Sequence, residues 1–465
     1  MDQSVRERHA SVLDRWIFFG LLALIALTTV PYGTVHAWWL ALFECLIFAL
    51  TALWIVGNQI SQARRISGHP LHRPLVALLI FALLQTLPLQ KVREGVWQTV
   101  SGDPYETWRF CFYLLALVLT GTLLLHYTST PRRLRLLVSV VVGIGLASAT
   151  FGMARQVAQG DAYLPFLSRL WPGRGYGQFI NQNHFAFLLE MPLGLVLGLL
   201  AGRGIKRDRA LIVLATAITM GAALVLSNSR GAIFAMLCQL LFLALMVGIT
   251  RARRESSEHP RSVYFRLQRL SSSLVGRIVL ITCLLIAVVF SIAWLGGDQL
   301  AHRMETVERD FSQGSSLRTN VTRWDMWSAT WQSIKANPLV GVGFGSYPSA
   351  ITKYHDGSGD LRPRQAHNDY LDLLACGGIV GFVLVVWFVI VFIKQVRGRL
   401  RSTDAFRRAA CLGALVGLFG VAAHSLVDFG LHNTANAVVF TSLVLIATLD
   451  SSVEERSLSG GDASP

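Results

Sequence analysis

The sequence predicts an all-α polytopic membrane protein with about twelve transmembrane helices. The 465 residues are 53% hydrophobic and only 15% charged, whereas a soluble globular protein carries about 25% charged residues. Apolar runs of about 20 residues recur along the whole length, and each can cross a hydrocarbon layer about 30 Å thick. Inside lipid such a run must be helical, because every backbone N–H and C=O group needs a partner within the segment.

Twelve apolar runs define the expected spans and divide the chain. Residues 1–295 hold helices 1–9, residues 296–369 form one long periplasmic loop, residues 370–449 hold helices 10–12, and residues 450–465 form a disordered cytoplasmic tail. The third run is short and ends near Pro88. We expect spans at 16–30, 35–56, 75–89, 108–126, 136–153, 184–200, 210–226, 232–249, 278–295, 370–393, 409–424 and 433–449.

The distribution of Lys and Arg predicts the orientation of the chain. A net charge of +15 is also found in nucleic-acid-binding proteins, but here the charges form short clusters between apolar runs. With both termini in the cytoplasm, the cytoplasmic segments carry 27 of the 42 Lys and Arg residues, and eight of the remaining 15 lie in the long loop. Long translocated loops are largely exempt from the positive-inside bias. The pattern therefore predicts a polytopic inner-membrane protein with both termini in the cytoplasm, without a nucleic-acid partner, that contacts membrane lipid.

Cysteine usage and the N-terminal residues give two smaller expectations. The six cysteines lie within or beside apolar runs, which is typical of packing residues and not of disulfides or a metal cluster. Residues 1–15 are polar and basic, and no small-residue cleavage site follows the first run. We therefore expect that run to remain in place as a signal anchor.

The long loop ends in a segment with the composition of a reactive site. A loop of this length in a compact membrane protein is usually functional, and His367 can act as a general base near neutral pH. Asp369 and Asp372 are close enough in sequence to orient that imidazole. The same residues also fit a helix start at a membrane interface, with an N-cap at Asn368 or Asp369 and Tyr370 as an interfacial aromatic.

Arg230 stands between the seventh and eighth spans with almost no loop around it. An arginine deep in a membrane costs about 2.5 kcal/mol or more, and its planar guanidinium binds phosphate through two hydrogen bonds. Gly231 and Ala232 would let a ligand or a backbone approach closely. The alternative is an arginine that extends its side chain to the interface.

A tryptophan-rich segment and a glycine run lie within the long loop. We expect a short helix from near Thr322 to Ala336, ended by Asn337 and Pro338. Trp327, with its neighbouring tryptophans, would stack on sugars or lie at the bilayer interface. The glycines that follow Pro338 resemble a nucleotide-binding loop, but no strand precedes them, so the required context is missing.

Two further clusters lie at the mouths of helices. Arg174, Asn181, Asn183 and His184 precede or open the sixth span, with Glu190 one to two turns further in, and suit either a polyhydroxylated ligand or ordinary helix capping. His424, Asp428 and His432 are spaced by four, so they would share one face of a continuous helix. Such spacing permits metal binding, but we expect a break near Gly430 and a polar clamp formed by His424 and Asp428, without a metal.

These motifs together resemble the O-antigen ligase and O-antigen polymerase superfamily. The resemblance rests on Ser-Arg-Gly-Ala at 229–232, on Arg323 with Trp327, on the run Asn-Pro-Leu-Val-Gly-Val-Gly-Phe-Gly at 337–345, and on His-Asn-Asp-Tyr at 367–370. His-Ser-Leu-Val-Asp-Phe at 424–429 is also similar to a motif of that family. The motifs extend over roughly residues 173–428, and the first five spans contribute only their topology.

The resemblance implies a membrane glycosyltransferase with a GT-C-like fold and no cofactor. The donor would be a glycan on undecaprenyl pyrophosphate at the periplasmic face, and the acceptor a glycan or the lipid-A core. His367 would deprotonate the acceptor hydroxyl, while Arg230 and Arg323 would neutralise the leaving pyrophosphate. Arg364 and then Arg174 are weaker candidates for the same role. Transfer would invert the anomeric carbon, and a chain-length regulator is a possible partner.

Two other functions fit a chain of this build. A twelve-helix transporter is the first, although such proteins often divide into two similar halves, and the loop lengths here fit that plan poorly. A metal-dependent oligosaccharyltransferase is the second, but the first external loop, 31–38, is short and has no carboxylate. The sequence leaves ligase against polymerase, the sugar and the acceptor open.

Overall fold

The computed structural model describes residues 3–30, 33–61, 68–88, 90–93, 96–158, 176–255, 323–354 and 364–449. These ranges form a mostly helical bundle with one small β-hairpin. The α-helices are α1 (Gln3–Thr29), α2 (Ala37–Ser61), α3 (His72–Gln85), α4 (Pro104–Tyr127), α5 (Pro131–Ala158), α6 (Gln182–Ala201), α7 (Ala210–Leu226), α8 (Arg230–Glu255), α12 (Arg323–Ala336), α13 (Tyr347–Ala350), α14 (Asp369–Arg399), α15 (Ala405–His424) and α16 (Thr434–Thr448). The 3₁₀ turns are η1 (Arg207–Arg209), η2 (Ile351–Lys353) and η3 (Gly430–His432), and the antiparallel strands are β1 (Gln90–Arg93) and β2 (Val96–Gln98).

The predicted fold class is confirmed for the described part of the chain. Nine of its helices are long and apolar enough to cross a membrane, and α3 and α16 are shorter apolar helices. Eleven of the twelve predicted spans coincide with these helices. The predicted ninth span, 278–295, lies outside the described residues, so the count of twelve and the GT-C-like arrangement stay predictions. The predicted loop helix is confirmed as α12, which ends at Ala336 just before Asn337 and Pro338.

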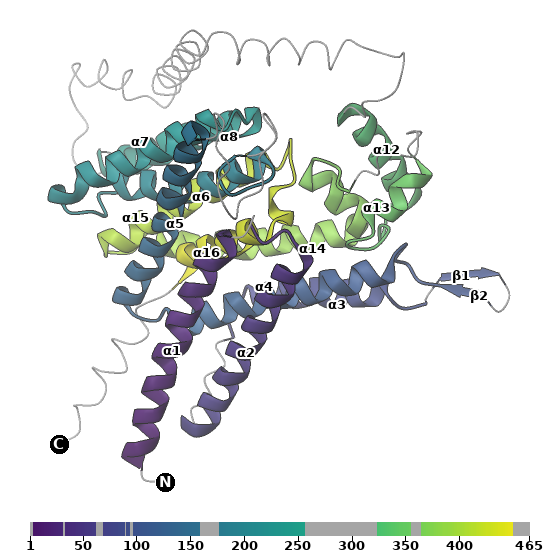
Figure 1. Ribbon diagram of the computed structural model, residues 1–465, viewed down its shortest axis with the longest axis horizontal. Coiled ribbons are helices and arrows are strands. Elements are labelled where there is room, and N and C mark those ends of the chain that lie inside the picture. Colours follow the sequence, from purple (N-terminus) through teal and green to yellow (C-terminus); the bar gives the residue numbers. More distant parts are fainter. Residues whose placement is uncertain are drawn as a thin grey trace, which may run out of the picture.

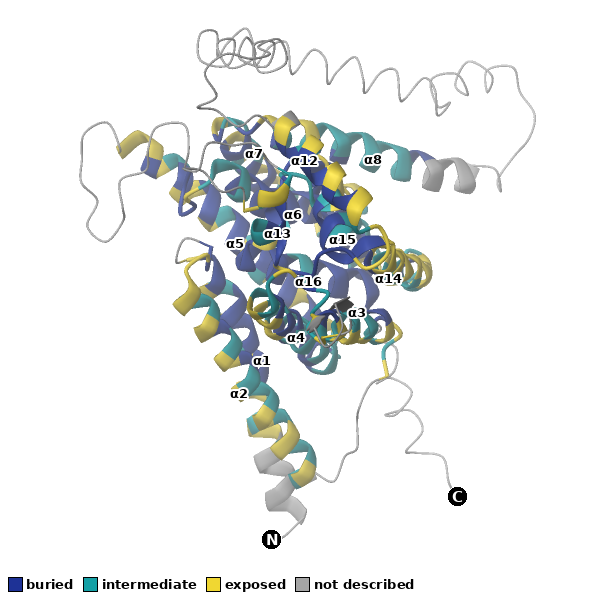
Figure 2. Ribbon diagram, turned by 90° about the vertical axis from the view of Figure 1, so that its right-hand side faces the viewer, coloured by how far each residue is buried: buried dark blue, intermediate teal, exposed yellow. Residues whose placement is uncertain are grey.

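The bundle is arranged around α6, α15 and α16. Figure 1 shows α5, α6, α7, α8 and α15 gathered together, with α12 and α13 beside one end of α14 and α3. Helices α1 and α2 form a hairpin that projects away from the rest. The centre is deeply buried, as the dark α6, α15 and α16 in Figure 2 show. Site residues carried by these helices are therefore attached to a deeply buried part of the described fold.

Close contact between glycines brings α6 and α15 together. A Cβ atom placed on Gly198 would lie 2.1 Å from the Cα atom of Gly413, and one on Gly194 would lie 2.3 Å from the backbone nitrogen of Gly417. Small residues four apart allow this backbone approach between membrane helices, where packing replaces the hydrophobic drive. The contact fixes the relative height of the start of α6 and the end of α15, which both carry site residues.

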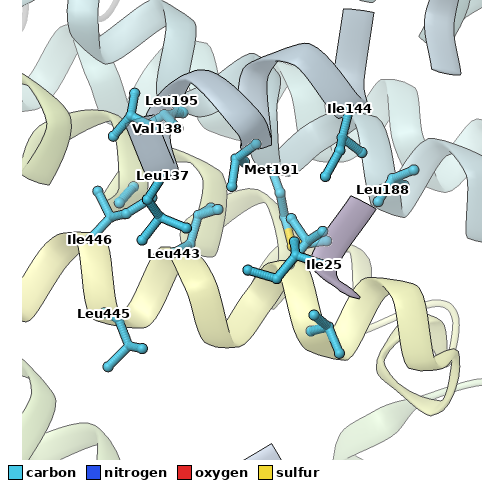
Figure 3. Close-up of a cluster of buried hydrophobic side chains, with 14 of the residues drawn as sticks. Ile25, Leu137, Val138, Ile144, Leu188, Met191, Leu195, Leu443, Leu445 and Ile446 are labelled. Carbon is cyan, nitrogen blue, oxygen red and sulfur yellow. The ribbon is translucent and has the colours of Figure 1, made fainter. Parts of the chain in front are cut away.

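Apolar side chains from four helices fill the space beside this contact. Figure 3 shows Ile25 of α1 packed with residues of α5, α6 and α16. The labelled members from those three helices are Leu137, Val138, Ile144, Leu188, Met191, Leu195, Leu443, Leu445 and Ile446. Since protein interiors are close-packed, this cluster joins the first helix of the chain to its last.

Helix α14 is broken at Gly378, and the glycine run completes its hydrogen bonding. Gly378 has φ +58°, a left-handed conformation that favours glycine. Upstream of the break, the carbonyl of Ala375 accepts from the N–H of Val342 at 2.9 Å. Downstream of it, the N–H of Ile379 donates to the carbonyl of Pro338 at 2.9 Å. The segment 338–343 thus supplies partners to both sides of the break.

Close approach explains why this segment is rich in glycine. Gly341 has φ +68°, and a Cβ atom there would lie 2.4 Å from the backbone of Cys376. Gln85, which ends α3 and is only 2% exposed, donates to the carbonyls of Val340 and Cys376 and accepts from the N–H of Phe344. The run is therefore a structural contact with α14 and α3, in agreement with the missing context for a nucleotide loop.

One end of the bundle collects the loops of interest. Helices α6, α8, α14 and α16 begin there and α7 and α15 end there, and we call it the site end. Basic side chains gather at the opposite end, on the connections that join α4 to α5, α6 to α7 and α14 to α15. The described ones include Arg132, Arg133, Arg135, Arg203, Lys206, Arg207, Arg209, Arg397, Arg399, Arg401, Arg407 and Arg408. The predicted orientation, which rests on these same charges, would direct the basic end to the cytoplasm.

Candidate functional site

The connection between α15 and α16, residues 425–433, is the meeting point of the site end. Its backbone carbonyls bind side chains from other helices: that of Leu426 accepts from Asn368 at 2.8 Å, and that of Gly430 accepts from Asn436 at 3.0 Å. Its Asp428 carboxylate accepts from Asn183 at the start of α6. Three helix starts are thereby fixed around one short segment.

His367 and Asp428 form a pair at the centre of this arrangement. The Nδ1 atom of His367 lies 3.4 Å from Oδ1 of Asp428, with the imidazole 31% exposed and the carboxylate 1% exposed. His367 has φ +49°, an uncommon conformation for a residue other than glycine. Such strained backbone tends to gather at functional sites. The pair has the geometry of a base whose inner nitrogen is held by a buried carboxylate and whose outer edge reaches solvent.

The surroundings of Asp428 keep its carboxylate charged. Besides Asn183, the backbone N–H of Phe429 donates to Oδ1 at 2.9 Å. Burial acts to raise the pKa of Asp428, but the neighbouring imidazoles, His367 first among them, outweigh burial and hold the pKa at about 2. A permanently charged carboxylate beside His367 stabilises the protonated imidazole, which is what a general base becomes after it accepts a proton.

Phe429 packs against three histidines. Its ring lies edge-on to His367 at 4.5 Å between centroids, to His184 at 4.9 Å and to His432 at 6.1 Å. Phe429 is 9% exposed. The ring limits the rotation of all three imidazoles, and two of them, His367 and His432, are thereby kept beside their carboxylate partners.

Asp369 and Asp372, the expected partners of His367, are paired with a different histidine. Nδ1 of His432 lies 3.3 Å from Asp369, and its Nε2 lies 3.3 Å from Asp372. The two carboxylates are three residues apart in the first turn of α14 and so share a face. Burial acts to lower the pKa of His432, but both carboxylates outweigh it and raise the pKa to about 10. The expectation that either aspartate orients His367 is wrong, since Asp428 occupies that place.

The predicted polar clamp of His424 and Asp428 is also corrected. Helix α15 ends at His424, earlier than the break expected near Gly430, so the two residues do not share a helical face. His424 instead pairs with Glu190 of α6 at 2.6 Å, and both side chains are fully buried. Next to this pair lies Gly231, where a Cβ atom would be 2.4 Å from Nε2 of His424. Each predicted clamp residue therefore has its own partner.

The four predicted arginines differ in how they are placed. Arg230 is the first residue of α8 and is exposed, directly before the Gly231 that packs on His424. Arg364 is exposed and precedes His367 by three residues. Arg323 begins α12, but its side chain lies outside the described part of the structure, as does the whole of Arg174.

The remaining predicted residues act largely as caps and ties. Asn181 is the N-cap of α6 and Asn368 the N-cap of α14, so the capping interpretation is confirmed for both. The Tyr370 hydroxyl donates to the carbonyl of Ala422 at 2.8 Å. Trp327 donates through Nε1 to the carbonyl of Ala366 at 3.0 Å, which ties α12 to the residue before His367.

The sequence assigns no role to Phe429 and does not predict the pairing of His432 with Asp369 and Asp372. A phenylalanine after a polar residue carries no signal of its own, and the pairing of His432 depends on which helix ends meet. Among the residues that the structure describes, no group of three or more His, Cys, Asp or Glu side chains is arranged to hold a metal ion.

Comparison with known proteins gives a match to one family model. Residues 215–386 match the family model described as O-antigen ligase. This match supports the O-antigen ligase and polymerase superfamily, the resemblance drawn from the motifs. The matched O-antigen ligase segment contains Arg230 and His367, whereas Asp428 lies beyond its end. No curated protein matches the chain.

Proposed function

We propose that this protein transfers a glycan from a lipid-linked pyrophosphate donor to an acceptor hydroxyl, with His367 as the general base. The single observation that carries the proposal is the pairing of a partly exposed His367 with the buried carboxylate of Asp428. The O-antigen ligase match supports glycan transfer in general. Because Nδ1 faces Asp428, Nε2 is the nitrogen left to meet an acceptor.

The reaction would follow from this arrangement in one displacement. Nε2 of His367 removes the proton of the acceptor hydroxyl as the oxygen attacks the anomeric carbon of the donor sugar. The bond between that carbon and the pyrophosphate oxygen breaks, and the electron pair leaves with the lipid pyrophosphate. Attack opposite the leaving group inverts the anomeric carbon. Asp428 stabilises the imidazolium until its proton passes to water.

Arginine side chains would hold the departing pyrophosphate. Arg230 suits this role because it stands exposed at the N-terminus of α8, where the helix dipole also favours an anion. Arg364 lies on the loop that carries His367, and Arg323 at the start of α12 is placed in the same role by its motif. Fixed positive charges that meet charge developing on the leaving group lower the barrier most. No metal or other cofactor is required in this scheme.

The membrane placement belongs to the same proposal. Basic side chains lie at the end of the bundle opposite His367, which supports a cytoplasmic location for that end and a periplasmic location for the site. Both termini would then be cytoplasmic in a bacterial inner membrane. The donor would be undecaprenyl-pyrophosphate-linked glycan, and the acceptor either the lipid-A core or a second glycan chain.

Purified protein incubated with lipid-linked O-antigen glycan and two alternative acceptors tests the proposal. One arm supplies core lipid A and the other a second lipid-linked glycan, so the product seen on a gel separates ligase from polymerase. His367→Ala should give no product in either arm. His69→Ala, at the opposite end of the bundle beside α3, is the matched control and should retain full activity. Full transfer by His367→Ala at normal protein level overturns the proposal.

A further inference from the structure

His432 holds a second charged cluster directly beside the His367–Asp428 pair. Both of its ring nitrogens face carboxylates at 3.3 Å, so no nitrogen is left for a ligand or a substrate. Asp369 and Asp372 belong to the first turn of α14, whereas His432 belongs to the connection that leads into α16. The cluster therefore joins two separate elements of the fold.

This junction is the place where His367 is set against its partner. His367 lies two residues before Asp369, and Asp428 lies four residues before His432. The same two segments are tied by Ser425, whose hydroxyl donates to Asp369 at 2.7 Å and whose carbonyl accepts from the N–H of that residue at 3.0 Å. A shift of α14 along this junction changes the distance between His367 and Asp428.

We infer that His432 is a positioning residue for transfer: held between Asp369 and Asp372, it locks the first turn of α14, and with it His367, onto the connection that carries Asp428. This inference rests on the proposed function, since it assigns His367 the role of base. It goes further in making the base depend on a second histidine that contacts no reacting atom.

The cluster also sets the charge that His367 experiences. Asp428 contacts His367 directly, and His184 of α6 and His432 pack against the same Phe429 ring as His367. Asp369 and Asp372 of α14 join this surrounding through their pairing with His432. Arg364 lies on the same loop as His367. A protonated His432 between two carboxylates leaves this cluster with a net charge of about −1. Removal of the imidazolium leaves both carboxylates uncompensated.

Charge variants of the full-length enzyme distinguish positioning from a merely structural role. The rate at saturating donor, followed from pH 5 to about 9, should rise as His367 loses its proton. His432→Gln makes the cluster more negative and so favours the protonated form of the base. The pH at which the rate rises should therefore increase by about half a pH unit to one unit. Asp372→Asn makes the cluster more positive, so the pH at which the rate rises should decrease.

The double variant should restore the net charge of the cluster. His432→Gln combined with Asp372→Asn removes one positive and one negative charge, so the rise should return most of the way to its original pH. The rate should stay low because the junction is loosened. KM for the donor should change less than twofold in all three variants, because none of them replaces an arginine of the proposed donor site. His69→Gln is the matched control and should leave the profile unchanged.

The outcomes separate this inference from the proposed function. If His367→Ala is inactive but His432→Gln keeps both the rate and the pH profile of the original enzyme, the positioning role is overturned and the proposed function stands. If His432→Gln and Asp372→Asn shift the pH at which the rate rises in the same direction, the charge argument is overturned. If His367→Ala is fully active, the proposed function itself fails. Thermal melting of each purified variant establishes that the measured protein is folded.

Discussion

The Nδ1 atom of His367 lies 3.4 Å from the Oδ1 atom of Asp428, although the first precedes α14 and the second follows α15. Between them the chain runs the full length of α14, turns at the basic end and returns through α15. The partnership therefore depends on the start of α14 meeting the segment that follows α15, and it lies partly outside the segment that matches the O-antigen ligase family.

Asp428→Asn should lower glycan transfer by about 100-fold, the order expected when general-base catalysis is lost. The amide keeps the size of the carboxylate but removes the charge that stabilises the protonated imidazole. Transfer is measured with purified variants and lipid-linked glycan. Asp208→Asn, an exposed aspartate at the opposite end of the bundle, should transfer at the original rate. Equal activity of the two variants would show that Asp428 does not assist His367.

Gly231→Ala should destabilise the protein and reduce transfer. The added Cβ would lie 2.4 Å from the fully buried His424 ring, and overpacking of this kind costs about 1–3 kcal/mol. The start of α8, including Arg230, would be displaced. Gly221→Ala in α7 is the matched control, because a Cβ atom there would have no other atom within 4 Å. Thermal melting in detergent should fall only for Gly231→Ala; an equal fall for both would contradict the contact.

Gly378→Ala should destabilise the break in α14 more than an alanine elsewhere in the same helix. The combination of φ +58° and ψ −161° is essentially restricted to glycine and costs an alanine about 1–3 kcal/mol, and its Cβ would lie 2.4 Å from the carbonyl oxygen of Leu339. Gly398→Ala, near the end of α14 and without atoms within 4 Å, should be neutral or slightly stabilising. Melting temperatures of the two variants test the difference, and a neutral Gly378→Ala would remove the argument from backbone conformation.

The stability of the protein should fall as the pH rises from 6.5 toward 10. The pKa of His432 is raised from its ordinary 6.5 to about 10 in the folded protein. A raised pKa means that the folded state binds the proton more tightly, so this stabilisation is complete below 6.5 and is lost as the pH passes 10. Melting temperature measured across that range should fall less in His432→Gln. An identical fall in both proteins would exclude His432 as its source.

The helices of this fold could be predicted from the sequence more completely than the contacts between them. Helix boundaries follow local signals: Asn337 and Pro338 end α12, and the polar residues before 370 mark the start of α14. His367 and Arg230 could be selected because charged groups beside membrane spans are costly and need a reason. These inferences use only neighbours in the chain.

Side-chain pairs between segments far apart in the chain could not be predicted from these local signals. Asp369 and Asp372 were the natural candidates to orient His367, because they are close in sequence. The left-handed turn at His367 and the helical face shared by the two aspartates direct them to His432 instead. Asp428 gains its role only because α14 and α15 meet at one end, and no local pattern encodes that meeting.

The hydrogen bonds between the glycine run and α14 limit which segments can be exchanged between related proteins. A chimera that takes residues 337–345 from another chain but keeps this α14 would set foreign amides against a broken helix that needs Pro338 and Val342 as partners. A chimera that takes only α14 from another chain would set this glycine run against a foreign helix, with the same loss of matched hydrogen bonds. An exchange of this loop therefore requires residues 337–381 to move together as one segment.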